Sequence, residues 1–348
     1  MAINVQHIQT TAKSAVNADK LMQTDYLNVS TDSRAKVANS LFVPLVGEHF
    51  DGHDHLLQAI ENGAVAALWQ EGTPLPVELE EAFPLFFVDD TLKALQTLAN
   101  KHRHEVDPVI VAVTGSNGKT TTKEIVASIL NGAYRVHKTE GNFNNHIGLP
   151  LTLLAMPLDC EVCVLEMGMN HFREIAVLST IAEPDFGIIT NIGESHIEFL
   201  GSREGIAKAK LEILEGMQAE STLIFDGDEP LLTEYLAKHN TIIQEMACGY
   251  QDNNDYVITD VDTHMEGSRF IVNDQEYRTT LLGAHNVKNT TYAIALAHKL
   301  NVSDSVIKAQ LQQSSGTSMR LETVKGQKGA LLINDAYNAS PTSMIAAI

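Results

Sequence analysis

The stretch Val109-Ile-Val-Ala-Val-Thr-Gly-Ser-Asn-Gly-Lys-Thr120 decides the fold of this chain. It begins as a continuous apolar strand, passes through a glycine turn and continues into helix-like residues at 121–130. A strand that is apolar along its whole length is typical of a parallel sheet covered on both faces. The glycines let backbone N–H groups point at one spot, and the helix N-terminus adds a favourable dipole. The stretch therefore predicts a phosphate-binding loop in an α/β sheet.

The loop departs from the strict G-x-x-x-x-G-K-[ST] pattern, because Val113 occupies the first glycine position and Gly115 supplies a turn two residues later. Lys119 is expected to neutralise the β and γ oxygens of a triphosphate, and the Thr120 hydroxyl is expected to hold Mg²⁺. The alternative is an ordinary glycine turn before a helix. Lys-Thr-Thr directly after an apolar strand favours ATP binding.

The rest of the chain repeats strand and helix. Strands are expected at 161–166 and 186–190, helices at 90–104, 171–180 and 286–300, antiparallel strands within 252–278 and a last strand at 329–334. This order predicts a central doubly wound, mostly parallel sheet, whose ligand binds beyond the carboxyl ends of the strands. A smaller α/β domain precedes it, and a third α/β domain begins near the end. The expected boundaries are 1–87, 88–317 and 318–348, with the third domain cut short at Ile348.

Composition excludes several classes of function. The 348 residues are 44% hydrophobic and 20% charged, which is too apolar for a disordered chain and long enough for two or three domains. The formal net charge of −20 disfavours nucleic acid and anionic membranes as partners. The sequence shows neither a leader pattern nor a long apolar run, so we expect a cytoplasmic location without membrane insertion.

Two groups of potential metal ligands are interpreted without a metal. Cys160 and Cys163 have the CxxC spacing of a metal site, but they lie in a strand-like run without a second pair, so buried strand cysteines are favoured. His49, His53 and His55 are irregularly spaced and joined by no cysteine. They are interpreted as surface or substrate-loop residues rather than metal ligands.

Six segments in fixed order resemble the Mur ligases and the related folylpolyglutamate synthases, which are ATP-dependent carboxylate–amine ligases. The first is the phosphate loop, Thr114 to Thr122. The others are Gly141-Asn-Phe-Asn-Asn-His-Ile-Gly-Leu-Pro150, Leu165-Glu-Met-Gly-Met-Asn170, Ser195 to Gly201 with Ala209 to Ile213, His285-Asn-Val-Lys-Asn289 and Asn334 to Pro341. Together they run through nearly the whole chain, and their order makes them far more specific than any one segment.

The resemblance assigns roles around the nucleotide. Glu166 and His196 match metal ligands, and Lys210, rather than the surface residue Lys208, matches a lysine that family members carry as a carbamate. With Thr120 they imply two Mg²⁺ sites, and Lys119, His196 and Lys210 are the implied catalytic residues. ATP is expected to contact Gly115, Asn117, Gly118, Lys119, Thr120, Thr121, Asn142, Asn286, Asn289, Arg320 and Asp335. For the two helix asparagines, helix capping alone is the alternative.

The first domain resembles the family's uridine-nucleotide-binding region. Ser33 and Arg34 are the residues implied to hold the diphosphate or uracil end, and Asn144 and Asn145 are implied to lie beside the acyl group of the substrate. The segments at Asn142, Glu166 and Asp335 most resemble the member that joins D-alanyl-D-alanine to UDP-MurNAc-tripeptide in peptidoglycan precursor synthesis. That member is expected to act as a monomer on these two substrates. A sibling that adds a diamino acid to UDP-MurNAc-dipeptide, or a shortened nucleotide-binding form without ligation activity, remains the alternative.

Overall fold

The computed structural model describes residues 3–21, 23–239, 241–313, 322–325, 331–337 and 344. The chain divides into two compact units, one of residues 1–108 with 140–160 and one of residues 109–139 with 161–348. The first unit therefore extends past residue 87, taking in the helix at 91–106 and the segment 140–160. The domain boundaries expected from the sequence stay a prediction.

The first unit contains a mixed sheet with strand order β1-β3-β4-β5-β6-β2, in which β3, β4, β5 and β6 are parallel neighbours. Its strands are β1 Ile3–Asn4, β2 Ser14–Val16, β3 Tyr26–Ser30, β4 Ser40–Phe42, β5 Ala64–Gln70 and β6 Leu85–Val88. Its helices are α1 Val5–Thr11, α2 Leu56–Glu61, α3 Thr91–Val106 and α5 Gly148–Leu154, with short 3-10 turns at Ala18–Leu21 and Gly52–His55.

Helix α3 shows why the local sequence folds as it does. The Asp90 carboxylate caps its first turn by accepting a hydrogen bond from the Lys93 backbone N–H at 2.9 Å. Leu95 and Leu98, at helical spacing, are fully buried. The helix ends where Asp107 takes a left-handed conformation with φ of 51°. The predicted helix at 90–104 is confirmed within two residues at its end.

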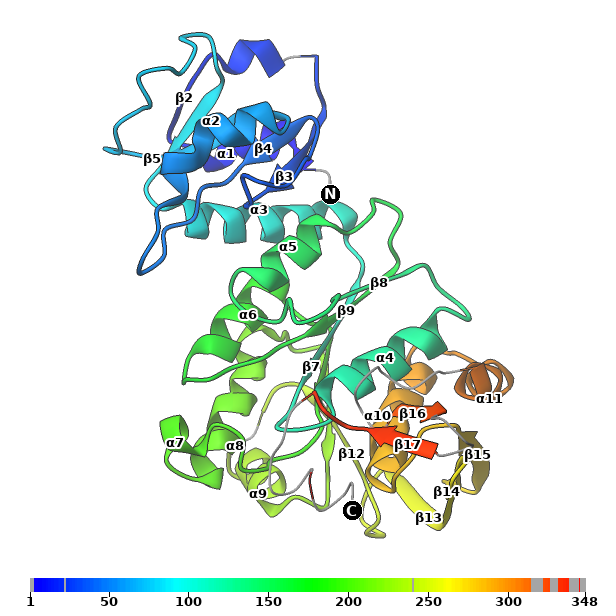
Figure 1. Cartoon of the computed structure of the whole chain (residues 1–348). Helices are drawn as coiled ribbons and strands as arrows, with labels where there is room; N and C mark the ends of the chain where they lie inside the picture. The colour runs from blue at the N-terminus through cyan, green and yellow to red at the C-terminus, as the bar shows by residue number, and fades with distance from the viewer. Residues whose placement is uncertain are drawn as a thin grey trace. The chain divides into compact units, whose positions relative to one another are not determined.

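The second unit is built on a larger sheet with strand order β15-β14-β13-β12-β11-β10-β7-β9-β8 (Figure 1). From β8 to β13 all neighbours are parallel, and β14 and β15 add antiparallel strands at one edge. The strands are β7 Val109–Thr114, β8 Val136–Lys138, β9 Val162–Glu166, β10 Phe186–Ile189, β11 Thr222–Asp226, β12 Gln244–Gly249, β13 Tyr256–His264, β14 Gly267–Val272 and β15 Gln275–Thr279.

Helices cover both faces of this sheet, with α4 and α10 on one side and α6 and α8 on the other (Figure 1). They are α4 Lys119–Leu130, α6 Glu174–Ala182, α7 Ile197–Leu200, α8 Arg203–Leu211, α9 Pro230–His239, α10 His285–Lys299 and α11 Asp304–Gln313, with a 3-10 turn at Glu212–Gly216. Because both faces are covered, every residue of β9 and β11 is buried. The predicted doubly wound α/β fold is confirmed.

Near the end of the chain, β16 Glu322–Lys325 and β17 Leu331–Asn334 form an antiparallel pair. The strand expected at 329–334 is therefore present over its described part. Cys163 lies within β9 and Cys160 just before it, and both are buried. In the described part of the chain, no helix has the length and apolar character needed to cross a membrane.

Candidate functional site

The phosphate loop joins the end of β7 to the start of α4, at the carboxyl edge of the large sheet. Gly118 precedes the helix with φ of +79°, a left-handed conformation that favours glycine. Lys119, Thr120 and Thr121 form the first turn of α4 and are half-buried. The Lys119 ammonium donates to the Gly115 carbonyl at 2.9 Å, so the lysine lies along the loop. These residues offer backbone N–H groups, a cation and two hydroxyls to a phosphate chain.

The neighbouring strand supports this loop through residues that sequence reasoning missed. After β10, the Thr190 hydroxyl donates to the Asn117 carbonyl at 2.6 Å, and the Asn191 amide donates to the same oxygen at 2.9 Å. Asn191 also accepts from the Asn117 N–H at 3.0 Å. The Gly193 N–H donates to the Ser116 hydroxyl at 2.9 Å. The loop is thus held in one conformation by a segment more than 70 residues away in sequence, which no local pattern indicates.

Gly115 has a specific steric reason to be glycine. Its φ is +151°, and a Cβ placed there would lie 1.8 Å from the Thr190 hydroxyl oxygen. We expect Gly115→Ala to push Thr190 off Asn117, to lower the free energy of unfolding by about 1–3 kcal/mol and to weaken nucleotide binding. Urea unfolding and ATP titration measure the two effects.

Gly72→Ala is the matched control, because Gly72 also has positive φ, of +85°, but no atom lies within 4 Å of its Cβ position. It reports the cost of the backbone conformation alone. Equal losses of stability in the two variants, with unchanged ATP affinity for Gly115→Ala, would contradict the steric argument.

Three basic groups gather beside the loop. Lys210, on α8, is buried with 2% of its surface exposed. Burial lowers the pKa of Lys210 well below its ordinary value, and repulsion from Lys119 adds to this effect. His196, which precedes α7 with φ of +66°, has a pKa lowered by burial and by repulsion from Lys210 and Lys119. The structure therefore brings together the three residues predicted to be catalytic, in a region where an anion is favoured.

The lowered pKa of Lys210 makes a prediction about stability. The unfolded chain holds this lysine protonated up to about pH 10.4, whereas the buried amine loses its proton at lower pH. Between the two pKa values the unfolded state binds more protons, so stability rises with pH. In bicarbonate-free buffer, Lys210→Met should raise the free energy of unfolding at pH 7 by about 1 kcal/mol or more. This gain should shrink as the pH approaches 10.

Urea unfolding from pH 7 to pH 10 measures the gap between the Met variant and the parent chain. Lys208→Met, two residues earlier on the same helix and exposed, is the control and should show little effect at any pH. A gap for Lys210→Met that stays constant with pH would contradict the burial argument.

Glu166 ends β9 and pairs in register with Val113 of β7, so its carboxylate lies beside the start of the loop. It is 3% exposed. Its backbone N–H donates to the Thr139 hydroxyl at 3.0 Å, and the Thr139 carbonyl accepts from the buried Lys123 ammonium at 2.7 Å. Lys123 also pairs with Glu124 at 3.0 Å. Helix α4 thus fixes both the phosphate loop and the position of Glu166, a link that the sequence analysis did not find.

Asn289 of α10 lies against the loop, and Asn286 of the same helix accepts a hydrogen bond from its side chain. A Cβ on Gly118 would lie 2.8 Å from the Asn289 side-chain oxygen, which places that side chain against the loop. Asn289 donates to the Asn286 oxygen at 2.9 Å, and Asn286 donates to the Leu282 carbonyl at 2.7 Å. The N-cap position is occupied by Ala284, so helix capping is not the role of either asparagine. Their contact with ATP stays a prediction.

The remaining predicted residues lie further along the chain or in the first unit. The Asp335 carboxylate acts electrostatically on His285, the first residue of α10, whose pKa is lowered by burial and raised by that carboxylate. Arg320 lies outside the described residues. Ser33 is buried and donates to Gln58 at 2.8 Å, and Arg34 pairs with Asp32 at 2.9 Å.

Asn142, Asn144 and Asn145 lie in the first unit. The Asn145 side-chain oxygen accepts hydrogen bonds from the N–H groups of Ile147 and Gly148, at 3.1 and 2.8 Å, just before α5. A turn of this kind is a local reason for asparagine at that position. The predicted roles of these three residues in binding ATP or the acyl substrate stay predictions.

Among the described residues, no group of three or more His, Cys, Asp or Glu side chains is arranged to hold an ion. Glu166 and Thr120 still offer the hard oxygen donors that Mg²⁺ prefers, and Mg²⁺ usually keeps several waters and phosphate oxygens as ligands. The residues present therefore fit a Mg²⁺ that takes most of its ligands from a nucleotide and water.

A glycine loop and two flanking asparagines at the carboxyl edge of a doubly wound sheet define a phosphate-loop nucleotide-binding protein. Comparison with known proteins narrows this class. The profile of the Mur ligase middle domain matches residues 113–297, and that of the Mur ligase family catalytic domain matches residues 25–103. The chain belongs to the Mur ligase family, as the ordered motifs predicted.

Comparison with individual proteins supports the same family. UDP-N-acetylmuramoyl-tripeptide–D-alanyl-D-alanine ligase of Bacillus subtilis is 46% identical over 346 residues, covering 99% of this chain and 74% of the relative. A crystal structure of MurF from Acinetobacter baumannii superimposes with a TM-score of 0.89 at 31% identity, over 99% of this chain and 75% of that one. MurF ligase from Thermotoga maritima, solved in complex with ADP, superimposes with a TM-score of 0.81 at 28% identity, over 92% of this chain and 73% of that one.

Proposed function

We propose that this chain is an ATP-dependent ligase that joins D-alanyl-D-alanine to UDP-MurNAc-tripeptide in peptidoglycan precursor synthesis. The activity named for the Bacillus subtilis relative, which is 46% identical, supports the choice of substrates. The observation that carries the chemistry is the gathering of Lys119, His196 and Lys210 around a phosphate loop, with Glu166 on the adjoining strand.

The proposed reaction has two steps. The terminal carboxylate of the tripeptide attacks the γ-phosphorus of ATP, and the bond to the β,γ-bridging oxygen breaks, giving an acyl phosphate and ADP. The amine of D-alanyl-D-alanine then attacks the acyl carbon and loses a proton. Phosphate leaves from the tetrahedral intermediate, and an amide remains.

The main physical barrier is the approach of a carboxylate to a polyanion. Lys119, at the first turn of α4, offsets charge on the transferred phosphoryl group, and the loop N–H groups orient it. Because this environment favours a neutral amine at Lys210, it also favours reaction of that amine with carbon dioxide to form a carbamate. A carbamylated Lys210 would supply an anionic oxygen next to His196. The protein's contribution is mostly positioning and electrostatic stabilisation.

Mg²⁺ is the implied cofactor. Thr120 and Glu166 are the residues proposed to hold one ion, and His196 with carbamylated Lys210 a second. When bound, the ions would neutralise phosphate and carboxylate charge in the transition state. Asn286, Asn289, Asp335 and Arg320 are proposed to contact the rest of ATP, as is Asn142. Ser33, Arg34, Asn144 and Asn145 are proposed to contact the UDP-MurNAc-peptide.

Lys119→Ala tests the loop as the ATP site. Removing the cation should abolish phosphate release in the presence of ATP, Mg²⁺ and both substrates, with at least a ~100-fold loss of rate, because phosphoryl transfer depends on charge stabilisation. Lys238→Ala, on the exposed face of α9, is the control and should keep the parent rate. Turnover retained in Lys119→Ala would mean that this loop does not hold the ATP.

The choice of amine is tested in the same assay by mass spectrometry of the product. D-alanyl-D-alanine with UDP-MurNAc-tripeptide should give the amide, whereas a diamino acid with UDP-MurNAc-dipeptide should not. Phosphate release with the second pair alone would identify the sibling ligase. Failure with both pairs, while the Bacillus subtilis relative turns over under the same conditions, would overturn the ligase proposal for this chain.

Lys210→Ala tests the carbamate. We expect turnover to be lost by ~100-fold or more, with partial recovery on adding acetate or propionate, because a small carboxylate can replace the missing anionic oxygens. In the parent chain, isotope-labelled bicarbonate should give a carbamate carbonyl signal by NMR that Lys210→Ala lacks and Lys208→Ala keeps. Normal activity in Lys210→Ala, or a signal that persists in it, would refute the assignment.

A further inference from the structure

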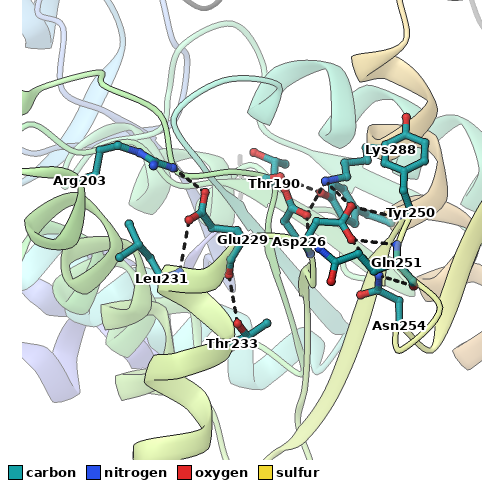
Figure 2. Close-up of polar contacts among 12 residues, drawn as sticks. Thr190, Arg203, Asp226, Glu229, Leu231, Thr233, Tyr250, Gln251, Asn254 and Lys288 are labelled. Atoms are coloured by element: carbon teal, nitrogen blue, oxygen red, sulfur yellow. Dashed lines mark hydrogen bonds and ion pairs between the residues drawn. The ribbon is translucent and has the colours of Figure 1, made fainter.

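Three carboxylates lie within four residues at the end of β11, at the carboxyl edge of the large sheet. Asp226 ends the strand, and Glu229 lies in the turn before α9 (Figure 2). Asp228 lies between them in the same turn. We call residues 226–229 the acidic loop. All three side chains are mostly buried, with exposed fractions of 11%, 15% and 12%. None of them was singled out from the sequence, and the proposed chemistry does not use them.

The first two carboxylates hold α10. The Lys288 ammonium lies 2.6 Å from an Asp226 oxygen and 2.9 Å from an Asp228 oxygen (Figure 2). Its exposed fraction is 20%, so this contact is poorly screened by water. A lysine in the first turn of a helix opposes the helix dipole. The two aspartates supply the negative charge that this helix end favours, and they make the position of Lys288 stable.

Asp228 is itself anchored to a third segment. Its carboxylate accepts hydrogen bonds from the Tyr250 N–H at 2.8 Å, the Gln251 N–H at 3.1 Å and the Asn254 amide at 3.0 Å. The Lys288 ammonium also lies 5.5 Å from the centre of the Tyr250 ring. The segment that follows β12 therefore holds the acidic loop in place, in addition to the contact with α10.

The third carboxylate faces the other way. Glu229 pairs with Arg203, the first residue of α8, at 2.6 Å (Figure 2). The same guanidinium nitrogen donates to the Ile192 carbonyl at 2.9 Å. Ile192 lies in the segment 190–196, which supports the phosphate loop and ends at His196. Helix α8 carries Lys210. Glu229 thus connects the acidic loop to the metal-binding side of the proposed site.

We propose that the acidic loop is a brace that fixes the two walls of the nucleotide site relative to each other. One wall is the start of α10 with Asn286 and Asn289, and the other is the segment 190–196. Asp226 and Asp228 position Asn286 and Asn289 through Lys288, and Glu229 positions the segment 190–196 through Arg203. Lys288, Asp226 and Glu229 are positioning residues, because they are proposed to act on the site through these other segments. The role in nucleotide binding rests on the proposed function, whereas the mechanical link does not.

The competing interpretation is a set of ordinary stabilising ion pairs. Such pairs would change the free energy of unfolding without a selective effect on the nucleotide. The brace instead requires two separable local effects, one at each wall. The contact of Asp226 and Asp228 with Lys288 and the contact of Glu229 with Arg203 act on different segments. Variants of Lys288 and of Glu229 should therefore loosen different segments.

The experiment measures three quantities on the full chain. They are the affinity for MgATP by calorimetry, amide hydrogen exchange in the nucleotide-free protein and the free energy of unfolding in urea. Lys288→Met should weaken MgATP binding about tenfold and speed exchange in residues 284–291. Lys288→Arg should recover most of the affinity. Glu229→Gln should instead speed exchange in residues 190–196.

A double-variant cycle and matched controls make the outcome decisive. Asp226→Asn combined with Lys288→Met should lose little more affinity than Lys288→Met alone, because the two side chains act as one contact. Lys299→Met, at the far end of α10, and Glu234→Gln, on α9, should leave affinity and local exchange unchanged.

The brace is overturned if Lys288→Met lowers the free energy of unfolding but leaves MgATP affinity and exchange at 284–291 within twofold of the parent chain. It is also overturned if the Lys288 and Glu229 variants loosen the same segments. If the parent chain itself fails to bind MgATP, the proposed function falls, and hydrogen exchange in the nucleotide-free chain still decides whether the acidic loop connects the two walls.

Discussion

The parallel register of β9, β7 and β10 is the constraint from which the candidate site follows. Val113 pairs with Glu166 on one side, and Thr114 pairs with Ile189 on the other. Three strand ends therefore lie side by side, and a different part of the site lies at the end of each strand. One gives the glycine loop, one ends in a carboxylate, and one leads through Thr190 and Asn191 towards His196. A one-residue slip of any of these strands would turn its side chains to the other face of the sheet.

Lys123, Lys210 and Lys288 of the second unit are all largely shielded from solvent, but they fall into two kinds, scaffold residues and a candidate ligand-binding residue. Lys123 and Lys288 each contact a carboxylate of the chain, at 3.0 and 2.6 Å. Burial with a matched anion fixes a side chain and leaves its charge compensated. The pKa of Lys210 is instead lowered by burial and then by repulsion from Lys119, and both lysines add to the effect of burial in lowering the pKa of His196. Basic groups gathered beside a phosphate loop suit an anionic ligand, such as phosphate or a carbamate.

Sequence patterns predicted those parts of this arrangement that depend on short-range periodicity. The apolar runs gave β7, β9 and β10, and the Gly-Lys-Thr turn gave the loop, because each is encoded within a dozen residues. Family resemblance added Glu166, His196 and Lys210 as candidates. Neither source indicated Asn191, Thr139 or the acidic loop. Their roles exist only after strands distant in sequence pair, and an aspartate after a strand looks the same whether it meets a lysine or solvent.

The same reasoning explains how a chain of net charge −20 offers a site for polyanions. At physiological ionic strength, exposed charges are screened over about 8 Å, so most surface carboxylates act weakly on the loop. What a phosphate meets is the local set of backbone N–H groups, Lys119 and the basic groups behind it. The carboxylates of the loop 226–229, at the same edge of the sheet, pair with Lys288 and Arg203. Their charge is therefore largely compensated where it lies, so these carboxylates oppose an incoming phosphate less than unpaired ones would.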